Sequence, residues 1–140
     1  MQAEEVVRAV YADFARGDVE AVLARFHPEI EFRLAEHHLY DRSGEGWVGP
    51  DAVAQNFLAR IGADWERFTV APRLWHAAGD AVVVEGRYAG EHRGTGRALD
   101  MQFCHVWRVT DGKVVRFQQY TDTAHLGEVA AMSKTPELAR

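Results

Sequence analysis

Two polar side chains, His105 and Gln119, fall among apolar residues in the second half of the sequence. Side chains alternate between the two faces of a strand, so residues two apart share a face. The residues that share the mostly apolar face of three successive predicted strands are Val82, Val84, Gly86 and Tyr88, then Met101, Phe103, His105 and Trp107, then Val115, Phe117, Gln119 and Thr121. Because most charged residues of these strands fall on the opposite face, we expect the first face to form the wall of a pocket.

An imidazole set into an apolar wall can donate a hydrogen bond or move a proton near neutral pH. We therefore expect His105 to serve as an acid/base or as an oxyanion donor, with Gln119 orienting it. The alternative is a core histidine whose hydrogen bonds are satisfied by Gln119 or by a backbone carbonyl. Both interpretations place the imidazole inside the fold.

Aromatic and aliphatic side chains dominate the remaining candidates for ligand contact. They are Tyr11, Phe14, Leu34, Trp47, Phe57, Val84, Gly86, Tyr88, Phe103, Trp107, Phe117 and Thr121. Tyr11, Tyr88 and Trp47 could offer a hydroxyl group or a ring to a ligand, although ordinary core packing with the polar tip at the edge is the default for each.

Other polar residues have simpler explanations. Asp122 precedes a predicted helix and should cap its backbone N–H groups. His37 and His38 are adjacent on a loop, and no further ligand follows at a spacing typical of zinc sites. We expect no bound metal and no cofactor.

The elements predicted from periodicity are helices first and strands second. Helical spacing of apolar residues covers 2–16 and 19–26, a strand covers 30–34, a polar loop covers 35–49, and a third helix starts at Pro50 and ends near 62–65. Alternating strands follow at 68–76, 81–91, 97–109 and 114–121, and a helix covers 123–132. This order predicts one α+β domain over 1–132, with 133–140 as a C-terminal tail.

The composition fits a cytoplasmic globular protein. Of its 140 residues 47% are hydrophobic and 26% charged, and the net charge of −5 argues against nucleic acid or an anionic membrane as a partner. No run approaches the ~18 apolar residues of a membrane span, and Glu4, Glu5 and Arg8 lie where a signal peptide has an uncharged core. The single Cys104 has no intramolecular partner, which is typical of a reducing compartment.

Three local patterns resemble the nuclear transport factor 2-like superfamily, and in particular its SnoaL-like branch, across residues 1–125. They are YADFARGDVEAVL at 11–23, WVGPDAV at 47–53 and HVWRVTDGKVVRFQQY at 105–120. The resemblance implies a cone-shaped roll, in which a curved mixed or antiparallel sheet packs against about three helices and encloses an apolar pocket. Members include ketosteroid isomerases, epoxide hydrolases, polyketide cyclases and binding modules, so the fold alone does not set the activity.

The catalytic positions implied by the resemblance match only in part. His105 stands where ketosteroid isomerases place a protonated acid and where SnoaL-like cyclases place a histidine. The isomerase base position falls on Leu34 and its tyrosine position on Val10, while the carboxylate of cyclases and hydrolases falls on Gln119. The hydrolase Arg-x-Asp pair falls on Gly86 and Tyr88.

Glu36 is the best substitute for the base, because it has the same strand parity as Leu34, although it also fits a solvated loop acid. It joins His105 and Gln119 as a candidate catalytic residue.

Two classes of function follow from these residues. One is a cofactor-independent isomerase, cyclase or hydrolase that acts on a small apolar substrate through His105. The alternative is a non-catalytic protein that binds a small ligand. The resemblance also implies a homodimer through the outer sheet face, where Val83, Cys104 and Val106 supply apolar area.

Overall fold

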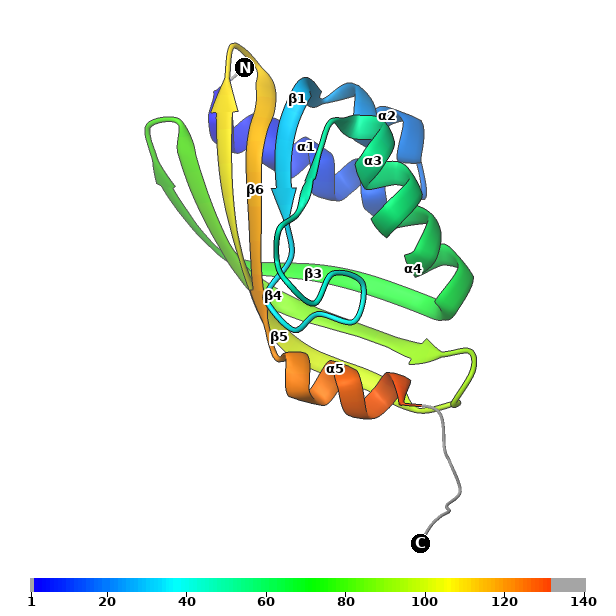
Figure 1. Cartoon of the computed structure of the whole chain (residues 1–140). Helices are drawn as coiled ribbons and strands as arrows, with labels where there is room; N and C mark the ends of the chain where they lie inside the picture. The colour runs from blue at the N-terminus through cyan, green and yellow to red at the C-terminus, as the bar shows by residue number, and fades with distance from the viewer. Residues whose placement is uncertain (1, 132–140) are drawn as a thin grey trace, which may run out of the picture.

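The computed structural model describes residues 2–131 and consists of a curved mixed sheet with helices on one face (Figure 1). Its six strands lie in the order β2-β1-β6-β5-β4-β3. They are β1 (Phe26–Arg33), β2 (Trp47–Val48), β3 (Trp65–Ala78), β4 (Ala81–His92), β5 (Ala98–Thr110) and β6 (Lys113–Thr121). β1 runs parallel to β6, and every other neighbouring pair is antiparallel. The predicted α+β class and mixed sheet are confirmed.

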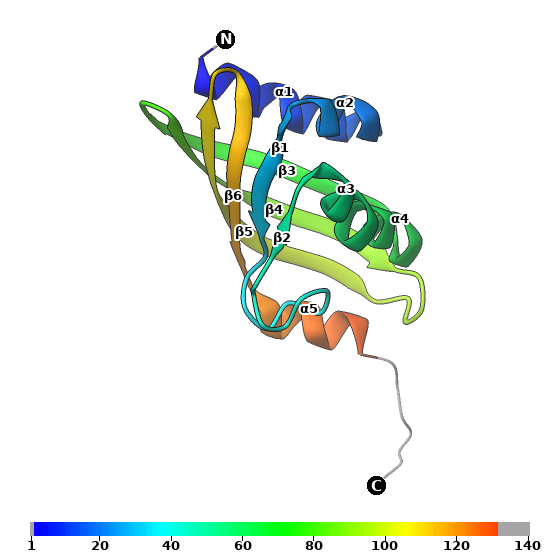
Figure 2. The same ribbon diagram turned by 45° about the horizontal axis from the view of Figure 1, so that its top comes forward.

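The helices cover the concave side of the sheet and one of its ends. They are α1 (Ala3–Ala15), α2 (Val19–Ala24), the continuous α3 (Pro50–Val53), η1 (Ala54–Leu58) and α4 (Ala59–Asp64), and α5 (Thr123–Ala130). Figure 2 shows α1 and α2 on one side of the concave face and α3 to α4 on the other, with α5 at the far end. None of the described helices is both long and apolar enough to cross a membrane. The predicted tail at 133–140 lies outside the described residues.

Helix α1 is held against the sheet by a buried stripe and by an ionic contact at its end. Val6, Val7 and Val10 are buried, as their helical spacing predicts. The buried Asp13 carboxylate accepts hydrogen bonds from Arg25 Nε at 2.7 Å and from Arg16 Nη2 at 2.8 Å. The hydrogen bond from Arg25, followed by that from Arg16, holds the pKa of this carboxyl below its usual range against the opposing effect of burial. These contacts fix the orientation of α1, so that its apolar stripe faces the sheet.

The boundaries differ from the predicted ones where the chain changes direction. Helix α2 ends at Ala24 and β1 begins at Phe26, because the strand pairs with β6 from that residue onward. In β6 the prediction for Val115 was wrong. An irregularity in the β5–β6 register pairs Val109 with Val114, and Val114 is the fully buried residue while Val115 is only half-buried.

The segment between β1 and β2 is more ordered than its polar composition predicts. Trp47 belongs to β2 and stacks on Phe57 with ring centroids 6.4 Å apart. Tyr40 is buried, and its hydroxyl donates to Asp64 Oδ2 at 2.6 Å. The Arg60 guanidinium lies 4.2 Å from the centre of the Tyr40 ring. This segment is therefore anchored on α4.

The sheet is tightly packed around Gly86, and a substitution there tests this packing. A Cβ atom there would collide with the Ala71 carbonyl oxygen and with the Phe103 ring, whereas a Cβ at Gly62 in α4 would meet nothing within 4 Å. We expect Gly86→Ala to lower the free energy of unfolding by about 3 kcal/mol, because overpacking displaces backbone. The control Gly62→Ala should raise it by about 0.5 to 1 kcal/mol, because alanine favours the helix. Urea denaturation measures both, and equal effects would contradict this packing.

Candidate functional site

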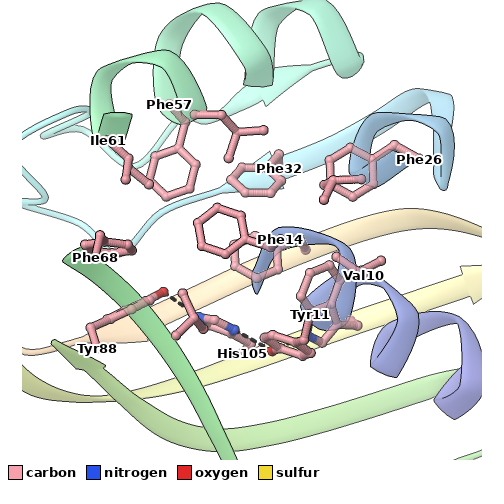
Figure 3. Close-up of a pocket in the computed structure, with 15 residues that line it drawn as sticks. Val10, Tyr11, Phe14, Phe26, Phe32, Phe57, Ile61, Phe68, Tyr88 and His105 are labelled. Atoms are coloured by element: carbon pink, nitrogen blue, oxygen red, sulfur yellow. Dashed lines mark hydrogen bonds between the residues drawn. The ribbon is translucent and has the colours of Figure 1, made fainter. Parts of the chain in front are cut away.

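An apolar cavity lies between the concave face of the sheet and the helices (Figure 3). Its volume is about 60 Å³. It is lined by Val10, Tyr11, Phe14, Val22, Phe26, Phe32, Phe57, Leu58, Ile61, Phe68, Val70, Tyr88, His105, Trp107 and Phe117. Among these side chains, only Tyr11, Tyr88, His105 and Trp107 carry a polar atom. The cavity wall is therefore almost entirely apolar and offers very few hydrogen bonds.

His105 is the central polar group of this cavity and is only 3% exposed. The strand register sets it between Val84 of β4 and Gln119 of β6. Its Nδ1 atom lies 2.6 Å from the Tyr11 hydroxyl oxygen, and its Nε2 atom lies 2.5 Å from the Tyr88 hydroxyl oxygen. Figure 3 shows the imidazole between these two phenols. Both ring nitrogens are thus occupied by tyrosine hydroxyls.

Each tyrosine oxygen also accepts a hydrogen bond from a second neighbour. Trp107 Nε1, which can only donate, lies 2.9 Å from the Tyr11 oxygen. Gln119 Oε1 accepts from the Ala35 backbone N–H at 3.3 Å, and this contact fixes the orientation of the amide. The Gln119 Nε2 group therefore donates to the Tyr88 oxygen at 2.9 Å. The result is a continuous chain of hydrogen bonds from Trp107 to Ala35.

A count of the protons in this chain of hydrogen bonds shows that one tyrosine O–H has no acceptor within it. A neutral imidazole has one N–H donor and one bare nitrogen that accepts. The tyrosine beside the bare nitrogen donates to it, and the tyrosine beside the N–H accepts from it. This second tyrosine already accepts from Trp107 or Gln119, so its own O–H has no acceptor within the network. Tyr11 and Tyr88 both line the cavity, so one hydroxyl donor without a partner in the network remains beside it.

Burial keeps all three groups neutral. Desolvation lowers the pKa of His105 well below its usual value. Burial likewise raises the pKa values of Tyr11 and Tyr88 above the usual phenol range. No carboxylate is among the described residues that line the cavity. A histidine in this state is a weak base at neutral pH, so the site is better suited to donating a hydrogen bond than to removing a proton.

The structure brings together about half of the predicted site. Tyr11, Phe14, Phe57, Tyr88, Trp107 and Phe117 line the cavity with His105. Gln119 is buried behind Tyr88 and lines a second, smaller cavity. Gln119 was expected to orient His105, but its amide donates to the Tyr88 oxygen, and the two ring nitrogens of His105 are hydrogen-bonded to Tyr11 and Tyr88 instead.

The other predicted residues lie outside the cavity. Leu34 and Val84 are buried in the core, and Phe103 stacks on the far side of the His105 ring at 3.9 Å between centroids. Gly86 is covered by that same Phe103 ring. Trp47 stacks on Phe57, and Thr121 donates to the Gln102 carbonyl at the exposed end of β6. Strand parity identified the face of each residue but not whether open space remains above it.

Glu36, the expected substitute base, does not reach the cavity. Strand β1 ends at Arg33, and the Glu36 side chain is exposed beside Gly44 on the outer surface. Hydrophobic lining residues that were not singled out as contacts include Val10, Val22, Phe26, Phe32, Leu58, Ile61, Phe68 and Val70. Helical stripes and strand alternation mark most of them as core, but do not distinguish core from cavity wall. Within residues 2–131 no group of three or more His, Cys, Asp or Glu side chains is arranged to hold a metal ion.

The lowered pKa of His105 predicts a specific dependence of stability on pH. The unfolded chain has a histidine pKa near 6.5, above that of folded His105, so protons favour the unfolded state. The contribution of neutral His105 is complete above about pH 6.5 and falls toward the folded pKa by up to ~1.4 kcal/mol per pH unit. As the pH falls below about 6.5, we expect the wild type to lose free energy of unfolding relative to His105→Gln, as measured by urea denaturation. A pH-independent difference would contradict a neutral His105.

Comparison with solved structures finds the same fold in several proteins. An NTF2-like protein from Burkholderia thailandensis E264 has 32% sequence identity and a TM-score of 0.86, covering 92% of this chain and 97% of that one. An NTF2-like protein of unknown function from Burkholderia pseudomallei K96243 has 26% identity and a TM-score of 0.83 over the same shares. TerC, co-crystallised with polyporic acid, has 29% identity and a TM-score of 0.80, covering 91% of this chain and 96% of TerC.

No curated protein matches the chain significantly. The family model of the SnoaL-like domain matches residues 7–117, a span that contains every residue lining the larger cavity. The chain therefore belongs to the SnoaL-like domain family, within the NTF2-like fold.

Proposed function

We propose that this protein binds a small, largely apolar molecule through one acceptor oxygen, such as a carbonyl. The observation that carries the proposal is the single hydroxyl donor left over by the chain of hydrogen bonds around His105. A buried donor without an acceptor costs about 1 to 3 kcal/mol. A ligand oxygen that accepts from it would recover this cost.

The cavity wall supports a ring compound as the occupant. Phe14, Phe32, Phe57, Phe68 and Phe117 all line it. Burial of apolar ligand surface contributes roughly 25 cal/mol per Å². The orientation of the ligand would then depend on the one hydroxyl donor, since the rest of the wall offers little polarity.

Binding of such a compound requires side chains at the mouth to move. The cavity of about 60 Å³ is smaller than the roughly 150 Å³ that accommodates benzene in an apolar protein cavity. Phe14, Leu58, Phe68 and Val70 line the cavity and are only half-buried, and the Phe14 and Phe68 rings meet edge to face at 6.5 Å. Displacement of the Phe14 ring would join the cavity to solvent between α1 and β3.

The similarity to TerC supports this class of ligand, because TerC was co-crystallised with polyporic acid. A reaction is the second candidate. Exchange of the His105 tautomer moves the free hydroxyl from one tyrosine to the other, and a donor of this kind stabilises an oxygen that gains negative charge in an isomerisation or cyclisation. Because none of the described residues at the cavity wall carries a carboxylate, we rank binding ahead of catalysis.

The proposal predicts a preference for an oxygen-bearing ligand that depends on the two tyrosines. We expect 1-tetralone to bind about 3- to 10-fold more tightly than tetralin, as one hydrogen bond allows. The double variant Tyr11→Phe/Tyr88→Phe should lose this preference, while each single variant leaves one hydroxyl beside His105. Isothermal titration calorimetry measures both affinities, and polyporic acid serves as a third compound.

The matched control is Tyr120→Phe, because Tyr120 is 56% exposed on the outer face. It should bind both compounds as the wild type does. Continued binding of tetralin shows that the double variant is folded. An unchanged preference for 1-tetralone in the double variant would rule out the tyrosine hydroxyls as its donor.

We also propose that two copies associate through the outer face of the sheet. Val83, Cys104 and Val106 are half-buried there, and Tyr120 projects beside two shallow surface hollows. We expect sedimentation equilibrium to give twice the mass of the 15.7 kDa chain, and Tyr120→Arg to shift the equilibrium toward one copy. A single-copy mass at micromolar concentration would contradict the dimer.

A further inference from the structure

A second, smaller cavity lies next to the first and shares part of its wall. Its volume is about 20 Å³, and it is lined by His38, Tyr40, Phe57, Ile61, Trp65, Phe68, Tyr88, Leu99, Met101, Gln119 and Leu126. Phe57, Ile61, Phe68 and Tyr88 line both cavities. A volume of this size admits one water-sized group. Tyr88 therefore separates the more apolar first cavity from a smaller second cavity with more polar walls.

His38 supplies this small cavity with an N–H donor. The side chain is only 4% exposed. Its Nδ1 atom accepts a hydrogen bond from the Tyr40 backbone N–H at 3.1 Å, so Nδ1 carries no proton. Burial lowers the pKa of His38 to about 4, and the ring is neutral at neutral pH. Its one proton therefore sits on Nε2, and no acceptor for that N–H is found among residues 2–131.

Gln119 supplies a second donor to the same cavity. Its amide group has two N–H bonds, and one of them is used by the Tyr88 oxygen. Its carbonyl oxygen accepts from the Ala35 N–H. The remaining N–H has no acceptor in the described part of the chain, and the residue is only 1% exposed. Two residues from separate elements, each with an N–H that lacks an acceptor among the described residues, thus line the small cavity.

We propose that the small cavity is a second binding subsite, which takes an acceptor oxygen at the far end of the ligand through His38 Nε2–H and the free N–H of Gln119. This inference rests on the proposed function and narrows it. The ligand class becomes an apolar ring molecule with two separated acceptor oxygens, one for a tyrosine hydroxyl beside His105 and one for His38 and Gln119. A group that can only donate is excluded from the small cavity.

Pairs of ligands that differ in one atom test the subsite. The 5-, 6- and 7-methoxy-1-tetralones each have an ethyl counterpart of similar size, in which a methylene replaces the ether oxygen. We expect at least one methoxy compound to bind about 3- to 10-fold more tightly than its ethyl counterpart, as a hydrogen bond allows. The His38→Asn variant should reduce that ratio by about threefold, because it removes the Nε2–H.

The choice of asparagine keeps the local backbone intact. In His38→Asn the side-chain amide oxygen would replace Nδ1 as the acceptor for the Tyr40 N–H, as in an Asx turn. The control is His37→Asn, because His37 is exposed and has a φ of 70°, which asparagine tolerates. This control should keep the wild-type ratio. Long-range proton–nitrogen NMR should also show the Nε2–H tautomer of His38.

The outcomes separate this inference from the proposed function. Three results would overturn the subsite while the preference for 1-tetralone over tetralin can stand. They are an affinity ratio of methoxy to ethyl compound near 1 for all three pairs in the wild type, the same ratio in His38→Asn as in the wild type, or an Nδ1–H tautomer of His38. If 1-tetralone shows no preference over tetralin, the proposed function fails and the subsite fails with it.

Discussion

The buried imidazole of His105, held between two tyrosine hydroxyls, is the interaction on which the rest of the site depends. Tyr11 comes from α1, Tyr88 from β4 and His105 from β5. The chain of hydrogen bonds continues to Gln119 on β6 and to the backbone of Ala35. Because these groups are buried, most of their polar atoms are paired with one another, and the arrangement links a helix, three strands and a loop in one geometry.

The packing around this chain leaves the imidazole little freedom. Phe103 stacks on one face of the ring, and the absence of a side chain at Gly86 makes room for Phe103. The Asp13 contacts at the end of α1 hold Tyr11 and Phe14 toward the sheet. The site therefore has a hydrogen-bonded polar end at His105 and an aromatic mouth at Phe14. This division suits recognition of one oxygen atom on ligands of varied shape.

Sequence periodicity predicted the polar end better than the loop. Strand alternation placed His105 and Gln119 on one buried face, and it failed at Val115 because a register irregularity changes the parity locally. The positions of His38 and Tyr40 depend on contacts with Phe57 and Asp64, which no local pattern reveals. Parity also assigned Val84 to the mostly apolar face, and Val84 is buried, but whether space remains above a residue is a property of the whole packed core.

Neutron diffraction from a deuterated crystal tests the central claim most directly, because it locates the protons. The predicted result is a neutral His105 with one N–D. One phenolic O–D, that of Tyr11 or Tyr88, should be directed into the cavity. A doubly protonated imidazole, or a tyrosine that has lost its proton, would contradict it. Either finding would change the number of free donors in the cavity and remove the basis for the proposed ligand class.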